Sequence, residues 1–351
     1  MTDPRRDTRP DAAVLAAFGL AAEPLRPAAA GLINRTWHAV SLAGERLILQ
    51  CVNPIFPPAV NEDIDAVTRH LAARGLPTTR IVPAADGRLW VEHGGAVWRV
   101  LTAMPGETRD ALRGTRDAAE AGRVLAEFHA AAADFDRAFG NARLGVHDTA
   151  AHVARLRRAL AEHSGHRDFA AVARIADEVL ERAARLPELP PAPDRVVHGD
   201  PKVSNIMFDP DTDEALCLID LDTLARMPVA LELGDAMRSW CNPQLEDTPT
   251  ASLSLPMFAA AVAGYARAAP GLLTEAEWSA IPDATLTITV ELAARFCSDA
   301  LLERYFRWDA ERYPSAGAHN RARARGQLAQ AASIDAQLGV MRDAVAAAFR
   351  G

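Results

Sequence analysis

Cysteine is scarce in this sequence. Its 351 residues include four cysteines, which are widely separated and lie in apolar surroundings: Cys51, Cys217, Cys241 and Cys297. No CxxC pair is present that could begin a zinc site. We therefore expect four reduced thiols inside the protein core.

Long apolar runs and an excess of basic charge are also missing. No apolar run approaches the roughly 20 residues that span a bilayer, and no secretory signal pattern follows the charged first residues. The net charge is −8, whereas nucleic-acid binding depends on clustered Lys and Arg. The one basic run, His319 to Arg325, is typical of a solvated helix face. We expect a cytoplasmic protein without a membrane or nucleic-acid partner.

The order of predicted elements indicates two lobes, because the chain exceeds the usual domain size of about 100–200 residues. Period-two patterns near the start predict strands at Gly31–Val40, Glu45–Val52, Arg88–Glu92 and Ala96–Leu101. Helical spacing predicts one helix among them, at Pro57–Ala73. Later helical patterns lie at Ala118–Ala133, Ala150–Glu162, Phe169–Leu186, Leu255–Ala268, Leu286–Phe306 and His319–Phe349. We expect a β-rich lobe over residues 1–103 and a mainly helical lobe over residues 104–351, an α+β fold.

One short β segment interrupts the helical part and carries the most specific motif. The loop His198-Gly-Asp-Pro-Lys-Val-Ser-Asn205 is followed by a strand, an Asp-rich turn and a second strand that ends at Asp220. Phosphoryl transfer needs a carboxylate for the acceptor, a cation for the transferred oxyanions and oxygen ligands for Mg²⁺, which Asp200, Lys202 and Asn205 can supply. Pairing of the two strands would bring Asp220 beside the loop as a second metal ligand.

Two other interpretations of such residues fit the sequence less well. Asp, Asn, Gly and Pro are common in ordinary turns, but a chance turn does not explain the whole series from His198 to Asp220. The triplet His166-Arg-Asp168 spells the protein-kinase signature, yet it has no Lys two positions on and no Asn five positions on. We interpret that triplet as unrelated to catalysis.

These motifs resemble those of the aminoglycoside phosphotransferase and choline kinase superfamily. The loop H-G-D-P-K-V-S-N-I-M-F-D and the later I-D-L-D carry the resemblance. The segments G-L-I-N-R-T-W, L-I-L-Q-C-V-N, W-R-V-L, E-L-G-D-A-M-R and E-L-A-A-R-F are similar to the N-acetylhexosamine 1-kinase branch. The resemblance covers most of the chain, from about Gly31 to Gln327.

The resemblance implies a protein-kinase-like, two-lobed fold that binds ATP and Mg²⁺. It implies that Asp200 is the catalytic base and that Asn205 and Asp220 hold Mg²⁺. Lys202 and His198, on the same loop, complete the expected catalytic set. The turn around Asn34, Arg35 and Thr36 is implied to cover the ATP phosphates.

The nucleotide lobe departs from the family pattern at one position. The family usually has a Lys on the third strand for the α- and β-phosphates, whereas this chain has Gln50 in L-I-L-Q. Gln50 either donates a neutral hydrogen bond or is a plain strand residue, and Arg35 or Arg46 can supply the cation. The candidate for a partner acid on the helix is Glu62.

The adenine is expected where the two lobes meet, beside the crossover that follows the strand at Arg99. The backbone from Leu101 to Met104 is the candidate contact for the base. The competing interpretation is that these residues simply end a strand inside the core.

A mixed set of charges is the candidate acceptor site. Glu232, Asp235 and Arg238 follow the metal strand where the chain enters a helix, and Glu291 and Arg295 lie one turn apart on an apolar helix. Charges in such places are either structural ion pairs or substrate ligands. Both interpretations stay open.

The expected function is ATP-dependent phosphorylation of a hydroxyl on a small molecule, with a sugar such as an N-acetylhexosamine as the first choice. Acceptor groups of both charge signs suit a neutral polyol. The alternatives are an amino alcohol, an aminoglycoside or a homoserine-like acceptor, and an inactive nucleotide-binding regulator. The sequence does not determine the oligomeric state or the choice between ATP and GTP.

Overall fold

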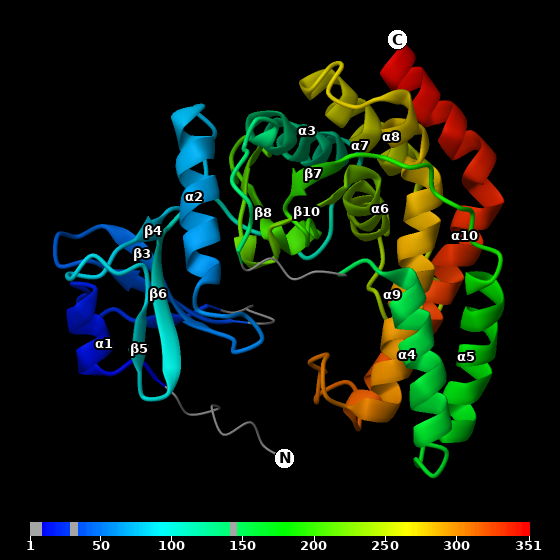
Figure 1. The fold of residues 1–351 in the computed structure, drawn as a ribbon, viewed down its shortest axis with the longest axis horizontal. Coiled ribbons are helices and arrows are strands. Elements are labelled where there is room, and N and C mark those ends of the chain that lie inside the picture. Colours follow the sequence, from blue (N-terminus) through cyan, green and yellow to red (C-terminus); the bar gives the residue numbers. More distant parts are fainter. Residues whose placement is uncertain (1–8, 29–33, 141–145) are drawn as a thin grey trace. The chain divides into compact units, whose positions relative to one another are not determined.

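The computed structural model of the chain describes residues 9–28, 34–140 and 146–351. They divide into two compact units, which Figure 1 shows as ribbons. The described residues of the first unit fall within Met1–Pro105 and Phe135–Ala142, and those of the second within Gly106–Asp134 and Arg143–Gly351. The sequence did not indicate that a segment after residue 134 returns to the first unit.

The first unit is built on an antiparallel sheet. Its strands are β1 (Arg26–Pro27), β2 (Arg35–Val40), β3 (Arg46–Val52), β4 (Ile81–Val82), β5 (Val91–His93) and β6 (Ala96–Thr102). Their order is β1-β2-β3-β6-β4, and β5 also pairs with β6. Two helices accompany the sheet, α1 (Ala12–Ala17) and α2 (Val60–Ala73). The expected β-rich unit with one long helix is confirmed.

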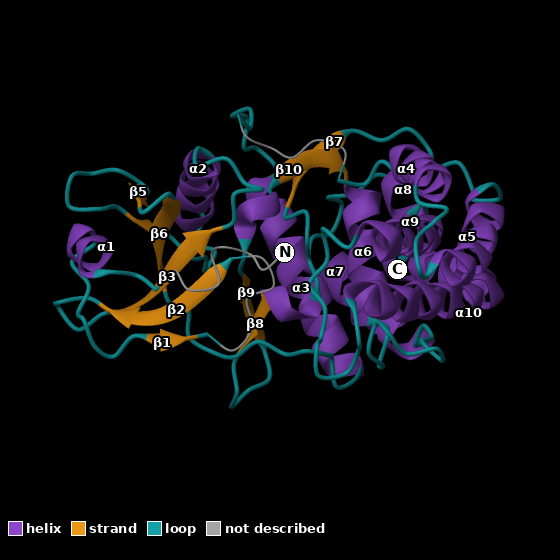
Figure 2. Cartoon of the chain, turned by 90° about the horizontal axis from the view of Figure 1, so that it is seen from below, coloured by secondary structure: helices purple, strands orange, loops and turns teal. Residues whose placement is uncertain are grey.

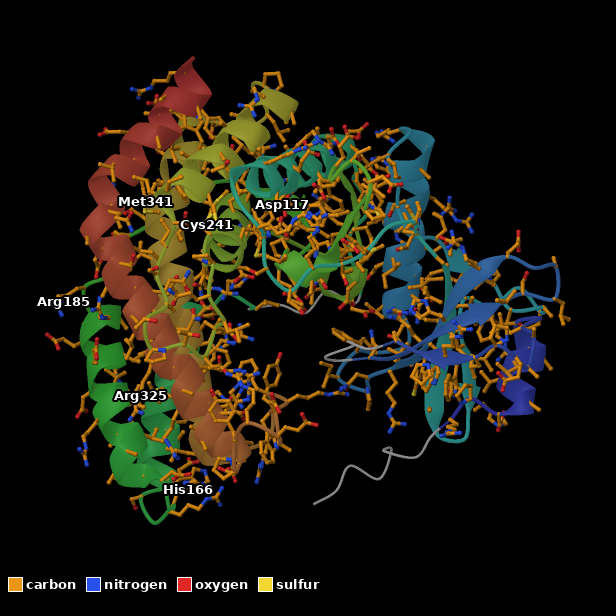
Figure 3. The ribbon with its side chains drawn as sticks, turned by 180° about the vertical axis from the view of Figure 1, so that it is seen from behind. Asp117, His166, Arg185, Cys241, Arg325 and Met341 are labelled. Atoms are coloured by element: carbon orange, nitrogen blue, oxygen red, sulfur yellow. The ribbon has the colours of Figure 1, made fainter. Side chains whose placement is uncertain are left out.

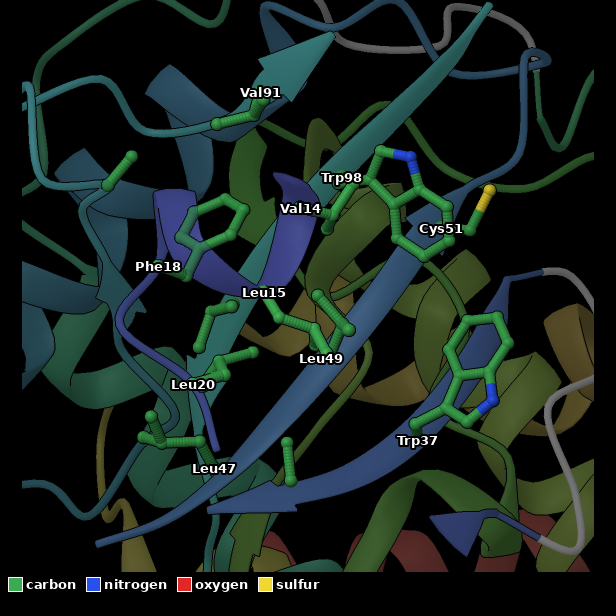
Figure 4. Packing of buried hydrophobic residues seen from close by; sticks show 13 residues of the cluster. Val14, Leu15, Phe18, Leu20, Trp37, Leu47, Leu49, Cys51, Val91 and Trp98 are labelled. Atoms are coloured by element: carbon green, nitrogen blue, oxygen red, sulfur yellow. The ribbon is translucent and has the colours of Figure 1, made fainter. Parts of the chain in front are cut away.

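The two faces of this sheet differ in chemistry. Because successive side chains of a strand point to opposite faces, Trp37, Leu49 and Trp98 share one face. There they form a hydrophobic core with Val14 and Leu15 of α1, which Figure 4 shows from close by. Burial of these side chains supplies the main driving force for folding this unit. The opposite face carries polar side chains that hydrogen-bond to one another.

The second unit is mainly helical. Its helices are α3 (Thr115–Ala132), α4 (Thr149–Glu162), α5 (Phe169–Ala183), α6 (Val229–Trp240), α7 (Leu255–Ala268), α8 (Glu275–Ser279), α9 (Ile281–Leu302) and α10 (Ala316–Arg350). Helix α9 is buried along most of its length and packs against α4, α5, α6 and α10, as Figures 1 and 2 show. Its apolar sequence therefore reflects the centre of a helical core. Among the described residues, no helix is long and apolar enough to cross a membrane.

Two antiparallel sheets of two strands each lie within the second unit. Strand β7 (Asp194–Val197) pairs with β10 (Ala225–Pro228), and β8 (Ile206–Phe208) pairs with β9 (Ala215–Leu218). The β8–β9 pair was predicted from the Asp-rich turn, whereas β1, β4 and β10 were not predicted. Those three strands have two to four residues, too few to show an alternating pattern.

The four cysteines lie in the protein interior, as expected. All four are free and buried. Burial raises the pKa of the Cys217 thiol to about 12. The Cys217 thiol is therefore protonated and unreactive at neutral pH, and all four cysteines are core residues, as the sequence predicted.

Candidate active site

The loop between β7 and β8 is held in one backbone shape. Gly199 has a φ of +85°, and a Cβ atom there would lie 2.1 Å from the carbonyl oxygen of Thr223. Only glycine fits such a position without strain. The Thr223 hydroxyl donates a hydrogen bond of 2.9 Å to the carbonyl oxygen of His198. This pair of contacts fastens the start of the loop to the residues that follow β9.

His198 lies inside the protein, behind the loop. Its Nε2 lies 2.8 Å from the carbonyl oxygen of Ile219, and its Nδ1 accepts a hydrogen bond of 3.3 Å from the amide of Asp200. Burial lowers the pKa of the His198 imidazole, so the ring is neutral at pH 7. Both ring nitrogens contact main-chain atoms, so the His198 ring fixes the backbone position of Asp200.

Asp200 is the half-buried acid of this loop. Its side chain is 26% exposed, and Lys202 Nζ makes an ion pair with Oδ2. Asn205 Nδ2 donates to the Asp200 carbonyl oxygen at 2.7 Å and to Oδ2 at 3.3 Å. Burial acts to lower the pKa of Lys202, but the carboxylates of Asp200 and Asp220 outweigh it and raise the pKa. The loop therefore presents a carboxylate, an ammonium and a carboxamide side by side.

Asp220 is brought back to the loop by the β8–β9 pair. Ile206 lies opposite Leu218, and the amide of Ile219 donates to the carbonyl oxygen of Asn205 at 2.9 Å. The predicted pairing of β8 with β9 is thus confirmed, and Asp220 comes two residues after the paired Leu218. Asp220 has the left-handed backbone values φ 64° and ψ 62°, a conformation that is costly for a non-glycine residue and is concentrated at functional sites.

The donor set near Asp220 fits a hard cation. Asn205 offers an amide oxygen and Asp220 a carboxylate, which are the ligands that Mg²⁺ prefers. Within the described part of the chain, no group of three or more His, Cys, Asp or Glu residues could hold a metal ion.

Glu232 of α6 lies beneath the loop and is fully buried. Its Oε1 accepts a hydrogen bond of 2.6 Å from the Gly199 amide, and its Oε2 lies 2.5 Å from Nε2 of His129 on α3. His129 Nδ1 is in turn 2.7 Å from the hydroxyl oxygen of Tyr265. Both oxygens of Glu232 are used inside the protein, so its geometry is that of a support for the loop. We had expected Glu232 among the acceptor ligands.

The other charged residues of the expected acceptor site form two pairs. On α6, Asp235 and Arg238 make an ion pair of 2.8 Å. On α9, Glu291 is buried and accepts hydrogen bonds from His147 Nδ1 at 3.1 Å and from the Thr149 hydroxyl at 2.7 Å. Sequence spacing suggested an ion pair between Glu291 and Arg295, whereas Glu291 is bonded to residues at the start of α4.

Arg295 and His147 complete this cluster. The Arg295 guanidinium lies 5.9 Å from the ring centre of Tyr305 and 5.8 Å from that of Phe306. Burial acts to lower the pKa of His147, but the hydrogen bond to Glu291 and the charges of Asp235 and Glu291 outweigh it, so the pKa is raised. Neither His147 nor Thr149 carried a sequence signal, because a lone His or Thr at a helix start is common in any protein.

Thr36 and Gln50, two of the residues expected at the nucleotide, lie on the polar face of the first unit. Thr36 lies opposite Gln50 in the β2–β3 register, and Gln50 Nε2 donates to the Thr36 hydroxyl at 3.2 Å. Asn34 accepts a hydrogen bond of 2.9 Å from the amide of Asn53 at the end of β3. Arg35 belongs to β2, and residues 31–33 of the N-terminal signature lie outside the described residues.

The expected adenine contacts lie at the end of β6. Leu101 is buried within that strand and pairs with Ile48 and Ile81. Met104 is half-buried just after the strand ends. The chain therefore leaves the sheet where the crossover was expected.

The triplet His166-Arg167-Asp168 has a structural role. It forms the turn between α4 and α5, where Figure 3 labels His166. Asp168 makes an ion pair of 2.5 Å with Arg321 of α10, and Arg167 makes one of 2.5 Å with Glu303. These contacts join helices, which accords with an origin unrelated to catalysis.

Solved structures of other proteins share this fold at low sequence identity. The microcompartment-associated aminopropanol kinase has a TM-score of 0.63 and 18% identity, over 93% of this chain and 97% of that one. An aminoglycoside phosphotransferase from Alicyclobacillus acidocaldarius has a TM-score of 0.61 and 18% identity, over 97% of this chain and 98% of that one. Amicoumacin kinase hAmiN, solved in complex with AMP-PNP, Ca²⁺ and Ami, has a TM-score of 0.60 and 13% identity, over 95% of this chain and 91% of that one. The kinase-like fold expected from the sequence is confirmed.

The sequence itself matches one family. A profile described as the phosphotransferase enzyme family, abbreviated APH, covers residues 24–278. This span contains the loop from His198 to Asn205, Asp220 and the polar face of the first unit. The match and the kinase-like fold identify a phosphotransferase that acts on hydroxyl groups of small molecules. The chain belongs to the phosphotransferase enzyme family.

Proposed function

We propose that this enzyme transfers the γ-phosphoryl group of ATP to a hydroxyl of a neutral sugar, with an N-acetylhexosamine as the first choice. The observation that carries the proposal is the geometry of one loop. Asp200, Lys202 and Asn205 contact one another, and the β8–β9 pair brings Asp220 beside them. This is the set of groups that phosphoryl transfer to an alcohol requires.

Each loop residue has a separate role in this proposal. The acceptor oxygen forms a bond to the γ-phosphorus while the bond from that phosphorus to the bridging oxygen of ADP breaks, and Asp200 accepts the hydroxyl proton. Lys202 offsets negative charge on the loop and the transferred group. Asn205 and Asp220 hold Mg²⁺, which neutralises charge on the phosphates when it is bound. His198 and Glu232 position the loop without touching the reacting atoms.

The first unit is proposed to bind the nucleotide. Asn34, Arg35 and Thr36 lie at the start of β2, next to the polar face that includes Gln50. The backbone from Leu101 to Met104, at the end of β6, remains the proposed contact for adenine.

The acceptor site is proposed to be the cluster of Asp235, Arg238, His147, Glu291 and Arg295. Two of its acids already have cationic partners, at 2.8 Å and 3.1 Å. Such internal pairs keep the site electrically balanced before substrate binds, and their remaining lone pairs and N–H groups suit sugar hydroxyls, which both donate and accept. The additional guanidinium of Arg295 disfavours a cationic acceptor.

An amine-bearing acceptor is the main rival. The named aminopropanol kinase and aminoglycoside phosphotransferase that share the fold suggest amines, but at 18% identity they support only the fold. A cationic amine is best held by an acid without another partner or by aromatic faces, and here Asp235 and Glu291 are already paired. A silent nucleotide-binding regulator is the second rival. The intact set of Asp200, Asn205 and Asp220 argues against it.

A competition between acceptor classes tests the proposal. ADP release from MgATP is measured by a coupled assay, and kcat/KM is compared for N-acetylhexosamines, simple hexoses, choline, ethanolamine, homoserine and an aminoglycoside. We expect the highest value for a sugar. A clear preference for the amine-bearing compounds would contradict the sugar assignment and leave the kinase chemistry in place, whereas no acceptor-dependent ADP release would favour the regulator. A cytoplasmic location remains a prediction.

A further inference from the structure

Arg295 is an exception on the buried helix α9, because its side chain stays partly exposed. Every other residue from Ala284 to Leu301 is buried. The acids Glu291 and Asp235 of the proposed acceptor cluster have other partners. Within the described part of the chain, no carboxylate forms an ion pair with the Arg295 guanidinium. A long, partly exposed side chain of this kind needs other contacts to hold it in one direction.

Two aromatic rings from the loop after α9 supply such contacts. The Arg295 guanidinium lies 5.9 Å from the ring centre of Tyr305 and 5.8 Å from that of Phe306. Both distances are within the roughly 6 Å over which a ring face attracts a cation. The two rings meet edge to face at 4.8 Å, and Phe306 packs on Phe296 of α9 at 4.5 Å. The direction of Arg295 therefore depends on where this loop lies.

One buried carboxylate fixes the backbone of the loop. Asp299 lies four residues after Arg295 on α9 and is 2% exposed. Its Oδ1 accepts hydrogen bonds from the amides of Arg304 at 3.0 Å and Tyr305 at 2.9 Å. Its Oδ2 accepts one of 2.9 Å from the amide of Phe306. Three consecutive amides of the loop thus converge on a single side chain.

The remaining contacts of Asp299 also lie within the protein. Asn320 of α10, which is fully buried, donates from Nδ2 to Asp299 Oδ2 at 3.0 Å. The amide of Glu303 donates to the Asp299 carbonyl oxygen at 2.8 Å, and Glu303 has a left-handed φ of 49° that ends the helix. Each carboxylate oxygen of Asp299 accepts two hydrogen bonds, which is its usual capacity. Asp299 is therefore built to hold the loop and not to contact a substrate.

We propose that Asp299 is a positioning residue for the acceptor: by holding the loop from Arg304 to Phe306, it keeps the two aromatic rings against Arg295 and so directs this guanidinium toward the substrate. This inference rests on the proposed function, because it takes Arg295 as a ligand of the acceptor. Hydrogen bonds to a carboxylate are roughly twice as strong as neutral ones, so one acid can order three amides. A directed guanidinium then offers its N–H groups to hydroxyl or carbonyl oxygens of a sugar.

The competing interpretation is that Asp299 only stabilises the end of α9. A purely structural role would lower the stability of any variant at this position, whatever residue stands at position 295. A positioning role makes a different prediction, because its effect on the acceptor must pass through Arg295. The coupling between the two positions therefore distinguishes the interpretations.

The test is a double-variant cycle on the acceptor KM. ADP release at saturating MgATP is measured for the parent, Asp299→Asn, Arg295→Met and the double variant, with the acceptor that gives the highest kcat/KM, which we expect to be an N-acetylhexosamine. Asn replaces one oxygen by NH₂, so two of the donors lose their partner. We expect Asp299→Asn to raise the acceptor KM about 3- to 30-fold, the range that corresponds to lost cation–π contacts. In the Arg295→Met background the same change should leave KM unaltered.

Two further variants control the experiment. Arg304→Ala removes an exposed side chain of the same loop but keeps the amide that Asp299 accepts, so its acceptor KM should equal the parent's. Tyr305→Leu removes one ring from a residue that is 37% exposed and leaves Asp299 in place. It should raise the acceptor KM only when Arg295 is present, and it carries the test if thermal unfolding shows that Asp299→Asn is not folded.

The outcomes separate this inference from the proposed function. A parent without acceptor-dependent ADP release contradicts the proposed function, and an Arg295→Met variant with the parent's KM contradicts the proposed acceptor site. If Arg295→Met raises KM while the folded Asp299 and Tyr305 variants keep the parent's value, the role of Asp299 alone is overturned. It is equally overturned if Asp299→Asn raises KM by the same factor in both backgrounds, since Asp299 would then act without Arg295.

Discussion

The loop from His198 to Asn205 and the polar face of the first unit hold their charged groups with different chemistry. On the loop, charged groups meet within a few residues, as in the contacts of Asp200 with Lys202. On the sheet face, the guanidinium of Arg99 is held by amides from two other elements, Gln50 and Asn61. The loop contacts join residues two to five positions apart in the sequence. In a sheet, paired strands place residues side by side regardless of their distance in sequence.

Replacing the carboxylate of the loop is expected to give the largest effect. Asp200→Asn removes the group that accepts the acceptor's proton, and loss of a general base costs about 10²- to 10⁴-fold in rate. Turnover is measured by ADP release at saturating MgATP and acceptor. The affinity for ATP should stay close to that of the parent, because the first unit is unchanged. A variant that keeps most of its turnover would remove Asp200 from this role.

Loss of a proposed Mg²⁺ ligand is expected to give the second-largest effect. Asp220→Ala and Asn205→Ala each delete one oxygen ligand, so both should raise the Mg²⁺ concentration needed for half-maximal activity. Asp220→Ala should have the larger effect because its ligand is charged. Magnesium titrations of activity give the comparison. Curves that superimpose on the parent's would show that the metal site lies elsewhere.

Glu232 distinguishes support of the loop from contact with the acceptor. Glu232→Gln replaces one carboxylate oxygen by an NH₂ group, which cannot accept the bond from Gly199 or His129, and an unsatisfied buried group costs about 1–3 kcal/mol. We expect kcat to fall with little change in the KM of the acceptor. If KM rises and kcat is kept, Glu232 binds substrate as first expected. Thermal unfolding of the variant checks that it is folded.

The pair of His147 and Glu291 should make stability depend on pH. Glu291 and Asp235 raise the pKa of His147 against burial and Arg295, and the nearby His152 has a lowered pKa because it is buried. A raised folded-state pKa means that the contribution of His147 is complete below its unfolded pKa of about 6.5. It is lost as the pH rises through the folded-state pKa.

The control for this pH dependence is His147→Gln, which keeps a neutral donor near Glu291. The parent's advantage over this variant in the free energy of unfolding should be greatest near pH 6 and shrink above neutrality. Denaturant unfolding at several pH values measures it. An advantage that grows with rising pH would contradict a protonated His147.

Gln50→Ala should give the smallest effect. It removes one hydrogen bond to Thr36 and one to Arg99, and a neutral hydrogen bond contributes about 0.5–1.5 kcal/mol. ATP affinity, measured by calorimetry, should therefore fall only modestly. A complete loss of activity in a folded Gln50→Ala variant would mean that Gln50 itself contacts the nucleotide.

Local patterns in the sequence predicted the parts that depend on local spacing. The strands around Thr36 and Gln50, the helix α7 and the return of Asp220 to the loop all follow from periodicity or a turn signal. The start of α9 was predicted at Leu286, whereas the helix begins at Ile281 in the structure. An apolar helix buried on all sides has no amphipathic edge to mark where it begins.

Contacts between distant segments could not be predicted in the same way. The sequence gives no reason to join Glu232 to His129, or Glu291 to His147, because each pair is formed by segments far apart in the chain. The same holds for Arg99, whose W-R-V-L segment indicated a strand and a family resemblance but no partner for its side chain. Its relation to Gln50 depends on strand register, which follows from the packing of the whole sheet.

Phosphorus NMR of a complete reaction tests the central claim most directly. The parent enzyme is mixed with MgATP and an N-acetylhexosamine, and the phosphorus species are followed over time. Our account predicts that each ADP formed is matched by one phosphate ester on the sugar, with no free phosphate and no ADP when the sugar is omitted. ADP formed together with free phosphate, whether or not sugar is present, would contradict transfer to a hydroxyl acceptor.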